Sequence, residues 1–217
     1  MDVSYLLDSL NDKQREAVAA SRTNMLVLAG AGSGKTRVLV HRIAWLQSVE
    51  NCSPYSIMAV TFTNKAAAEM RERLAALIPS GTRGMWVCTF HAMCVRMLRE
   101  DGAALNLKPN FSILDSDDVL SLLKDCGGTT DAAVARQWQW QISLWKNQGL
   151  NAATALAQTS GDEGHRSAAM VMQRYEERLL AYQSVDFDDL IGLPLKLLQN
   201  HTDVRAKWQQ PLAYVLV

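Results

Sequence analysis

The stretch that decides the fold is Ala29-Gly30-Ala31-Gly32-Ser33-Gly34-Lys35-Thr36. It lies between an apolar run at residues 25–29 and a helical pattern at residues 35–47. The glycines let the backbone turn closely around an anion, because glycine tolerates positive φ. The N–H groups that open the following helix point towards the same anion. The stretch therefore predicts a phosphate-binding loop between a strand and a helix.

Two side chains of this loop suit the phosphates of a nucleotide. Lys35 would neutralise the charge of the β- and γ-phosphates, and the hydroxyl of Thr36 would ligate Mg²⁺. We therefore assign catalytic roles to both and make Thr36 the metal ligand. Ala29 stands where the pattern usually has its first glycine. The loop leaves the reaction open, and the alternative is a glycine-rich turn with a chance lysine.

Two more β-rich runs, at residues 57–63 and 85–90, each lead into a helical pattern, at residues 65–77 and 92–100. Both runs are nearly all apolar or β-branched, which is typical of strands covered on both faces. Repeated alternation of strand and helix predicts a parallel sheet with helices on its faces.

The pattern is different between about residues 100 and 184, where the sequence predicts helices. We expect one from Asp115 or Ser116 to about Lys124, stopped by Gly127-Gly128. Two others are expected at 131–147 and about 167–183. Trp138 and Trp145 share one face of the second, which favours a core role.

The alternation resumes at residues 185–190, and residues 213–217 predict another buried strand. The expected organisation is thus 1–90, a helical insertion at 91–184, and a return to the first domain at 185–217. Three acids, Asp186, Asp188 and Asp189, suggest either a metal site or, as we favour, a helix cap.

Composition fits a folded protein, with 48% apolar and 20% charged residues. No apolar run approaches the ~18 residues that span a bilayer. The four cysteines form no C-x-x-C pair, so neither a zinc site nor a disulfide framework is expected, and we expect a reducing cytoplasm. Net charge is zero. Residues 1–100 hold 12 Lys+Arg against 8 Asp+Glu, so an anionic polymer would favour that half, although such an excess is also ordinary scatter.

Several stretches resemble the UvrD/Rep/PcrA group of superfamily 1 DNA helicases, over nearly the whole chain. The most specific is Ala59-Val60-Thr61-Phe62-Thr63-Asn64-Lys65-Ala66-Ala67-Ala68-Glu69-Met70, which resembles the family's motif Ia. The further matches are residues 10–18 with the Q motif, 29–37 with motif I, 89–91 with motif Ib, and 110–114, 145–147 and 185–190 with the Rep branch.

The resemblance implies ATP and Mg²⁺ as cofactors. The amide of Gln14 suits the N6/N7 edge of adenine, although a solvated helix residue is the simpler alternative. In the family the position of Arg37 packs on the base. The nucleotide-binding residues implied are Gln14, Ala29, Gly30, Ala31, Gly32, Ser33, Gly34, Lys35, Thr36 and Arg37.

The resemblance also implies contact with single-stranded DNA at the carboxyl ends of the second and third predicted strands, where ligands gather in open parallel sheets. Phe62 there can stack on a base, and neighbouring hydroxyls and amides can hold phosphates. A core aromatic and a structural histidine are the alternatives for Phe62 and His91. The DNA-binding residues implied are Thr61, Phe62, Thr63, Asn64, Thr89, Phe90 and His91.

The implied fold is a RecA-like P-loop parallel sheet with an all-helical inserted subdomain. The implied function is the N-terminal motor portion of an ATP-dependent 3′–5′ DNA helicase. Its partners would be single-stranded DNA and single/double-strand junctions, with no membrane.

In the family, Asp-Glu follows the strand that corresponds to residues 213–217, and Val217 is the last residue here. We therefore expect these 217 residues alone to bind nucleotide weakly, to hydrolyse it feebly and not to unwind DNA. The alternatives are a non-catalytic nucleotide and single-strand binding module, and a P-loop kinase or small-molecule transferase.

Overall fold

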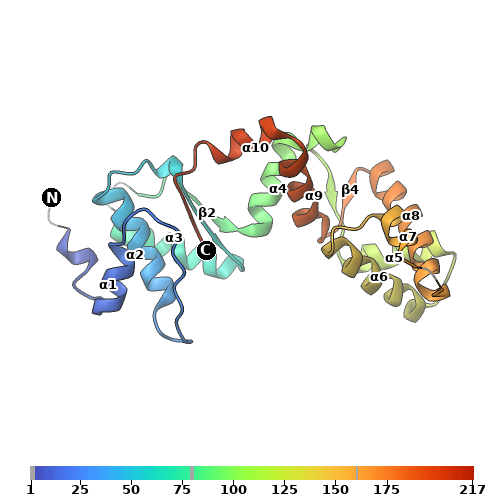
Figure 1. Ribbon diagram of the computed structural model, residues 1–217, viewed down its shortest axis with the longest axis horizontal. Helices are drawn as coiled ribbons and strands as arrows, with labels where there is room; N and C mark the ends of the chain where they lie inside the picture. Colours follow the sequence, from blue (N-terminus) through green and yellow to red (C-terminus); the bar gives the residue numbers. More distant parts are fainter. Residues whose placement is uncertain (1–2, 79–80, 160) are drawn as a thin grey trace. The chain divides into compact units, whose positions relative to one another are not determined.

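A computed structural model describes residues 3–78, 81–159 and 161–217. The chain forms two compact units, one of residues 1–90 and 206–217 and the other of residues 91–205, here called unit 1 and unit 2. Figure 1 traces the chain through both. Within the described ranges, no helix has the length and apolar character needed to cross a membrane.

Unit 1 contains a parallel sheet, as the alternation predicts. Its strands are β1 (Ile57–Thr61), β2 (Trp86–Thr89) and β5 (Tyr214–Leu216), in the order β2-β1-β5. All pairings are parallel. The helices and 3-10 turns of this part are η1 (Ser4–Leu6), α1 (Asp12–Val18), α2 (Lys35–Ser48), η2 (Pro54–Ser56) and α3 (Asn64–Leu77).

The core of unit 1 lies where α2 and α3 pack on the central strand. Strand β1 is buried at Ile57 and Ala59, and these residues join Ile43 and Leu46 of α2 and Leu74 of α3 in one cluster. Burial of such side chains contributes about 1.5–3 kcal/mol each. This packing holds α2 against the sheet and thereby positions the glycine-rich loop that precedes it.

The strand predicted at residues 25–29 is wrong. This segment has no regular secondary structure and belongs to neither sheet, and Leu26 is 81% exposed. A parallel strand is stabilised by ladder hydrogen bonds and by cover on both faces, and the segment has neither among the described residues. The apolar composition that suggested a buried strand therefore faces solvent.

The last strand forms as predicted but is not fully buried. Strand β5 pairs only with β1 among the described strands, and Val215 is 59% exposed. An edge position explains this exposure, because an edge strand is covered on fewer sides than a central one.

Unit 2 is mainly helical. Its helices include α5 (Ser116–Gly127), α6 (Ala132–Asn147), α7 (Ala152–Ala157), α8 (Glu163–Ala181) and α9 (Asp189–Asn200). The turn η3 (Gly102–Leu105) also belongs to unit 2, whereas α4 (Phe90–Asp101) and α10 (Thr202–Gln209) include residues of both units. The short helix α7 was not predicted, because its six residues are too few to show a helical period of apolar side chains.

Predicted helix ends are confirmed where a cap was identified. Asp115 caps α5 by accepting from the N–H groups of Asp117 and Asp118, and Gly128 ends the helix in the left-handed conformation at φ 65°. Asp131 caps α6 in the same way. The prediction that Trp138 and Trp145 line the core is also confirmed.

The expectation of an all-helical insertion is wrong in one respect. Two short strands, β3 (Ser112–Ile113) and β4 (Ser184–Val185), pair in parallel in unit 2. Two-residue strands show no period in a sequence, and their pairing joins segments far apart in the chain. The predicted run at 185–190 thus begins in this second sheet and continues into α9.

Candidate nucleotide and nucleic-acid sites

The backbone of the glycine-rich loop accepts hydrogen bonds from the side chain of Lys35. The Nζ atom of Lys35 donates to the carbonyl oxygens of Ala29 at 2.8 Å and Gly30 at 2.9 Å. Gly32 and Gly34 have φ of 73° and 86°, a region that favours glycine. Gly34 directly precedes α2. The sequence therefore dictates this turn locally, as expected.

The start of α2 has the properties of an anion site. No side chain caps it, so its first N–H groups stay available, and α2 carries no acid in its first turn. Lys35, Thr36 and Arg37 are exposed there. In the described residues no group of three acidic, histidine or cysteine side chains could hold a metal. The hydroxyl of Thr36, together with phosphate oxygens, is the donor set that fits Mg²⁺ here.

Gln14 lies against this loop. Its Nε2 donates to the carbonyl of Ser33 at 3.1 Å, and its Oε1 accepts from the N–H of Asn11 at 3.0 Å. A Cβ atom on Gly34 would lie 2.9 Å from the same Nε2. Gln14 is therefore brought to the loop, 19 residues away in the chain, and its amide links α1 to the loop's backbone.

A pocket of about 360 Å³ lies beside the start of α2. Two cationic side chains, Arg37 and Arg73, lie at its wall, and apolar atoms complete it. Its full lining is Arg37, Val40, His41, Arg73, Ala76 and Leu77. The combination suits a flat, uncharged ring joined to a phosphate chain, because arginine stacks on aromatic faces and attracts anions.

Two aromatic rings meet at the carboxyl ends of β1 and β2. Phe62 is 79% exposed, and its ring centroid lies 5.6 Å from that of Phe90 at an interplanar angle of 42°. The core alternative for Phe62 is therefore wrong. An exposed aromatic at this position presents a face on which a nucleic-acid base can stack.

Residues with polar side chains lie next to Phe62 in the sequence and at the end of the adjacent strand. Thr61 and Thr89 are paired in register on adjacent strands, and Thr89 is buried. Thr63 caps α3, with its Oγ1 accepting from the N–H of Ala66 at 3.1 Å. Asn64, the first residue of α3, is exposed. The carboxyl ends of β1 and β2 thus bring together Thr61, Phe62, Thr63, Asn64, Thr89 and Phe90.

In unit 2, His91 stacks on an aromatic residue that the sequence analysis missed. The rings of His91 and Phe187 have centroids 4.1 Å apart and an interplanar angle of 26°, and Phe187 is 62% exposed. Phe187 follows a strand end, β4, as Phe62 follows β1. That shared position was the signal that could have identified it.

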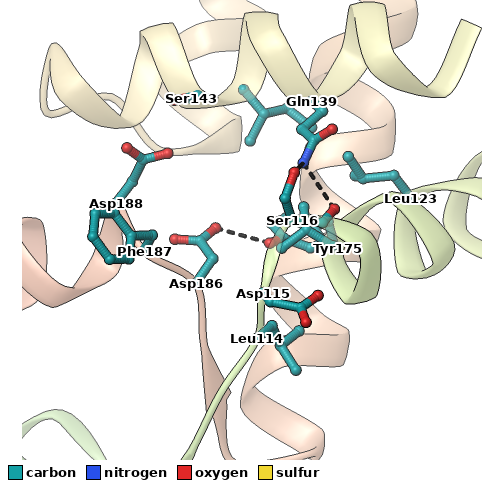
Figure 2. A pocket seen from close by; sticks show the side chains of 12 residues that line it. Leu114, Asp115, Ser116, Leu123, Gln139, Ser143, Tyr175, Asp186, Phe187 and Asp188 are labelled. Carbon is teal, nitrogen blue, oxygen red and sulfur yellow. Dashed lines mark hydrogen bonds between the residues drawn. The ribbon is translucent and has the colours of Figure 1, made fainter. Parts of the chain in front are cut away.

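A buried ionic network holds the turn that carries Phe187. The Nζ atom of Lys146 donates to Asp186 Oδ2 and, at 2.9 Å, to Asp189 Oδ1. The hydroxyl of Tyr175 donates to Asp186 Oδ2 at 2.8 Å, and Figure 2 shows these two side chains facing each other. Asp188, the residue before α9, makes no side-chain cap bond, so it does not cap the helix as the sequence suggested it could. Asp186 Oδ1 does accept from the N–H of Asp189, the first residue of α9, at 2.9 Å.

The electrostatics of this network are strongly coupled. Burial, opposed by Lys146 and assisted by the neighbouring carboxylate of Asp186, raises the pKa of Asp189 to about 6. Burial opposes ionisation of Asp186 too, but its bonds to Lys146 outweigh burial and lower its pKa. Burial lowers the pKa of Lys146, and the two carboxylates more than offset this. At neutral pH one cation is thus shared between two carboxylates.

A cavity of about 480 Å³ adjoins the network. Apolar side chains of α5 and α6 form one wall, including Leu123 and Ile142, and the turn with Phe187 forms another. Figure 2 shows Gln139 reaching Ser116, whose carbonyl accepts from its Nε2 at 3.1 Å. Asp186, Phe187 and Asp188 of the turn therefore line this cavity together with residues of α5 and α6.

Comparison with known proteins identifies the family of the chain. The UvrD/REP helicase N-terminal domain profile matches residues 10–217. DNA helicase II of Escherichia coli (strain K12) is 50% identical over the whole of this chain, and the ATP-dependent DNA helicase PcrA of Leuconostoc citreum is 44% identical. The ATP-dependent DNA helicase UvrD1 of Mycobacterium leprae (strain TN) is 42% identical.

The chain spans about 30% of the length of each of these relatives. The resemblance first noted on the motif-like stretches is thereby confirmed over the full chain. The chain belongs to the UvrD/REP helicase N-terminal domain family.

Proposed function

We propose that the chain is the nucleotide- and DNA-binding front portion of an ATP-dependent DNA helicase motor. It would bind Mg²⁺-ATP at residues 29–37 and single-stranded DNA at the carboxyl ends of β1 and β2. Translocation from 3′ to 5′ and preference for single/double-strand junctions come from the family resemblance. The observation that carries the proposal is the exposed ring of Phe62, packed on the half-buried ring of Phe90 where β1 and β2 end.

The nucleotide part rests on charge and geometry. Lys35 at the loop, the uncapped start of α2, and the pocket with Arg37 and Arg73 together offer cations, N–H donors and an apolar wall. Such a set recognises the phosphates of a nucleotide and its base. In a RecA-like site Lys35 would exchange its carbonyl partners for phosphate oxygens, and Thr36 would help hold Mg²⁺.

The DNA part rests on the exposed rings of Phe62 and Phe187. Phe62 with Phe90 in unit 1, and Phe187 with His91 in unit 2, are two separate places where a base could stack. Base stacking on aromatic side chains contributes about 1–3 kcal/mol per base and accepts any sequence. Thr63 and Asn64 at the start of α3 can contact phosphate beside Phe62.

Isothermal titration calorimetry with Mg²⁺-ATP tests the nucleotide site. Lys35→Ala is expected to abolish measurable binding, because it removes the only charge of the loop that faces the phosphates. Lys13→Ala is the matched control, since Lys13 is an exposed lysine paired with Glu16. Unchanged affinity in Lys35→Ala would contradict the assignment.

Fluorescence anisotropy with a labelled oligo-dT tests the DNA site. Phe62→Leu is expected to weaken binding roughly tenfold, in line with the loss of one stacked base. Tyr55→Leu, which alters another exposed aromatic of unit 1, should leave affinity unchanged. If the two variants bind equally well, Phe62 does not contact DNA.

A further inference from the structure

We propose that Lys146 is a positioning residue for DNA binding: by clamping both ends of the turn at residues 186–189, it holds the exposed ring of Phe187 in place against His91. The inference deepens the proposed function, because it rests on Phe187 being a surface on which a base stacks. Lys146 itself would not touch DNA, and no residue of its network would need to.

The first support is that the turn is closed on itself. The N–H of Asp186 donates to Asp189 Oδ2 at 3.1 Å, and the N–H of Asp189 donates to Asp186 Oδ1 at 2.9 Å. Lys146 then contacts both carboxylates from α6. Phe187 and Asp188 are thus the two middle residues of a turn whose ends are bonded to each other and to one cation.

The second support is that α6 also holds the middle of the turn. Asn147, next to Lys146, donates from Nδ2 to Asp188 Oδ1 at 3.0 Å and to the carbonyl of Ser143 at 2.8 Å. Two consecutive residues of α6 therefore restrain three of the four residues of the turn. The fourth, Phe187, is the one with an exposed side chain.

The third support is that Lys146 cannot serve as an ordinary DNA-binding lysine. Its side chain is only 10% exposed, and its amine is committed to two carboxylates and lies 5.2 Å from the Tyr175 ring centroid. A lysine that contacts phosphate is normally exposed. Lys146 would then affect DNA affinity through Phe187. Because the Phe187 ring is already ordered before DNA binds, the entropic cost of ordering it on binding is avoided.

The test is a double-mutant cycle on the 217-residue chain. The affinity for an oligo-dT with one central 2-aminopurine would be measured for the wild type, Lys146→Met, Phe187→Leu and the double variant. We expect Lys146→Met and Phe187→Leu each to weaken binding about five- to tenfold and to reduce quenching of 2-aminopurine to the same extent. The double variant should be no weaker than Phe187→Leu alone, because both changes remove one interaction.

The dependence of DNA affinity on salt concentration shows whether a variant has lost a contact with phosphate. Neutralising a lysine that touches phosphate lowers the slope of log affinity against log salt by about one. Lys146→Met should leave this slope unchanged. Lys146→Arg, which keeps the cation, should recover at least half of the lost affinity. Lys124→Met removes a lysine of α5 outside the network and should behave as wild type.

Folding is controlled with a milder variant. Lys146→Met leaves two buried carboxylates without their cation and can unfold unit 2. Asn147→Ala removes only the bond to Asp188 and the bonds within α6, and should weaken binding about two- to threefold with an unchanged melting temperature. If Lys146→Met does not fold, Asn147→Ala in the wild-type and Phe187→Leu backgrounds decides the matter.

The outcomes separate the inference from the proposed function. Undiminished binding in Phe187→Leu would overturn the stacking role of Phe187 and the inference with it. If Phe187→Leu weakens binding while folded Lys146→Met and Asn147→Ala do not, only the inference falls. Additive losses in the double variant, or a reduced salt slope in Lys146→Met, would also overturn it.

Discussion

His91 and Phe187 belong to segments far apart in the chain, yet their rings stack with centroids 4.1 Å apart. His91 is the second residue of α4, and Phe187 precedes α9. The family resemblance implied that His91 contacts DNA, and in the structure its ring supports the ring of Phe187.

Substitution of His91 distinguishes the two tasks. His91→Leu is expected to weaken single-stranded DNA binding about threefold, whereas His91→Phe should retain the wild-type affinity because a phenyl ring can stack on Phe187. Anisotropy titrations at two salt concentrations measure both, with His201→Leu as the control in unit 2. A loss of affinity in His91→Phe, accompanied by a lower salt slope, would favour the phosphate contact instead.

Replacement of Gln14 should affect the nucleotide site in two ways. Gln14→Ala removes the amide that bonds to Ser33 and Asn11, so the loop loses a restraint, and adenine would lose its hydrogen-bonding partner. We expect ATP affinity to fall about tenfold and to approach the affinity for GTP. The reason is that the two uncharged hydrogen bonds between the amide and adenine together contribute about 1–3 kcal/mol. Competition titrations with the two nucleotides check this, and a retained preference for ATP would contradict it.

The stability of unit 2 should be sensitive to Gly127. A Cβ atom there would lie 2.0 Å from Cζ3 of Trp138, so the core indole would have to move. Gly127→Ala is expected to destabilise the unit by about 1–3 kcal/mol, as overpacking does. Gly192→Ala, in α9 with open space around its Cβ, should instead stabilise by about 0.5–1 kcal/mol. Urea unfolding followed by circular dichroism compares the two.

The Lys146 network should leave a pH signature in stability. Burial raises the pKa of Asp189 to about 6, above the ordinary value of 3.8, so the folded state binds its proton more tightly than the unfolded state does. This contribution to stability is present below about pH 4 and is lost as pH rises to about 6, by at most about 3 kcal/mol. The pKa of Asp186 is lowered, so its own contribution to stability is present above about pH 4 and is lost as pH falls below that value.

Asp189→Asn isolates the first of these contributions. Its free energy of unfolding should fall less than that of the wild type between pH 4 and pH 6. Asp117→Asn, an exposed acid on α5, serves as the control and should follow the wild type. Parallel curves for all three proteins would show that Asp189 titrates normally.

Local signals in the sequence determined much of this molecule. Gly34 before Lys35 sets the start of α2, and Asp115 and Gly128 set both ends of α5, because caps and left-handed turns depend on a few adjacent residues. The parallel pairing of the strands at Ile57 and Trp86 followed from the alternation of strand and helix. Resemblance of short motifs then indicated the family.

Only the tertiary structure decided what depends on residues far apart in the chain. The run at Leu26 reads as a strand, but a ladder needs a neighbour, and the described residues supply none. The acids around Phe187 could be read as a metal site or a cap until Lys146 of α6 was found between two of them. Burial, partner and orientation are properties of the folded chain, because they arise from contacts that no local pattern encodes.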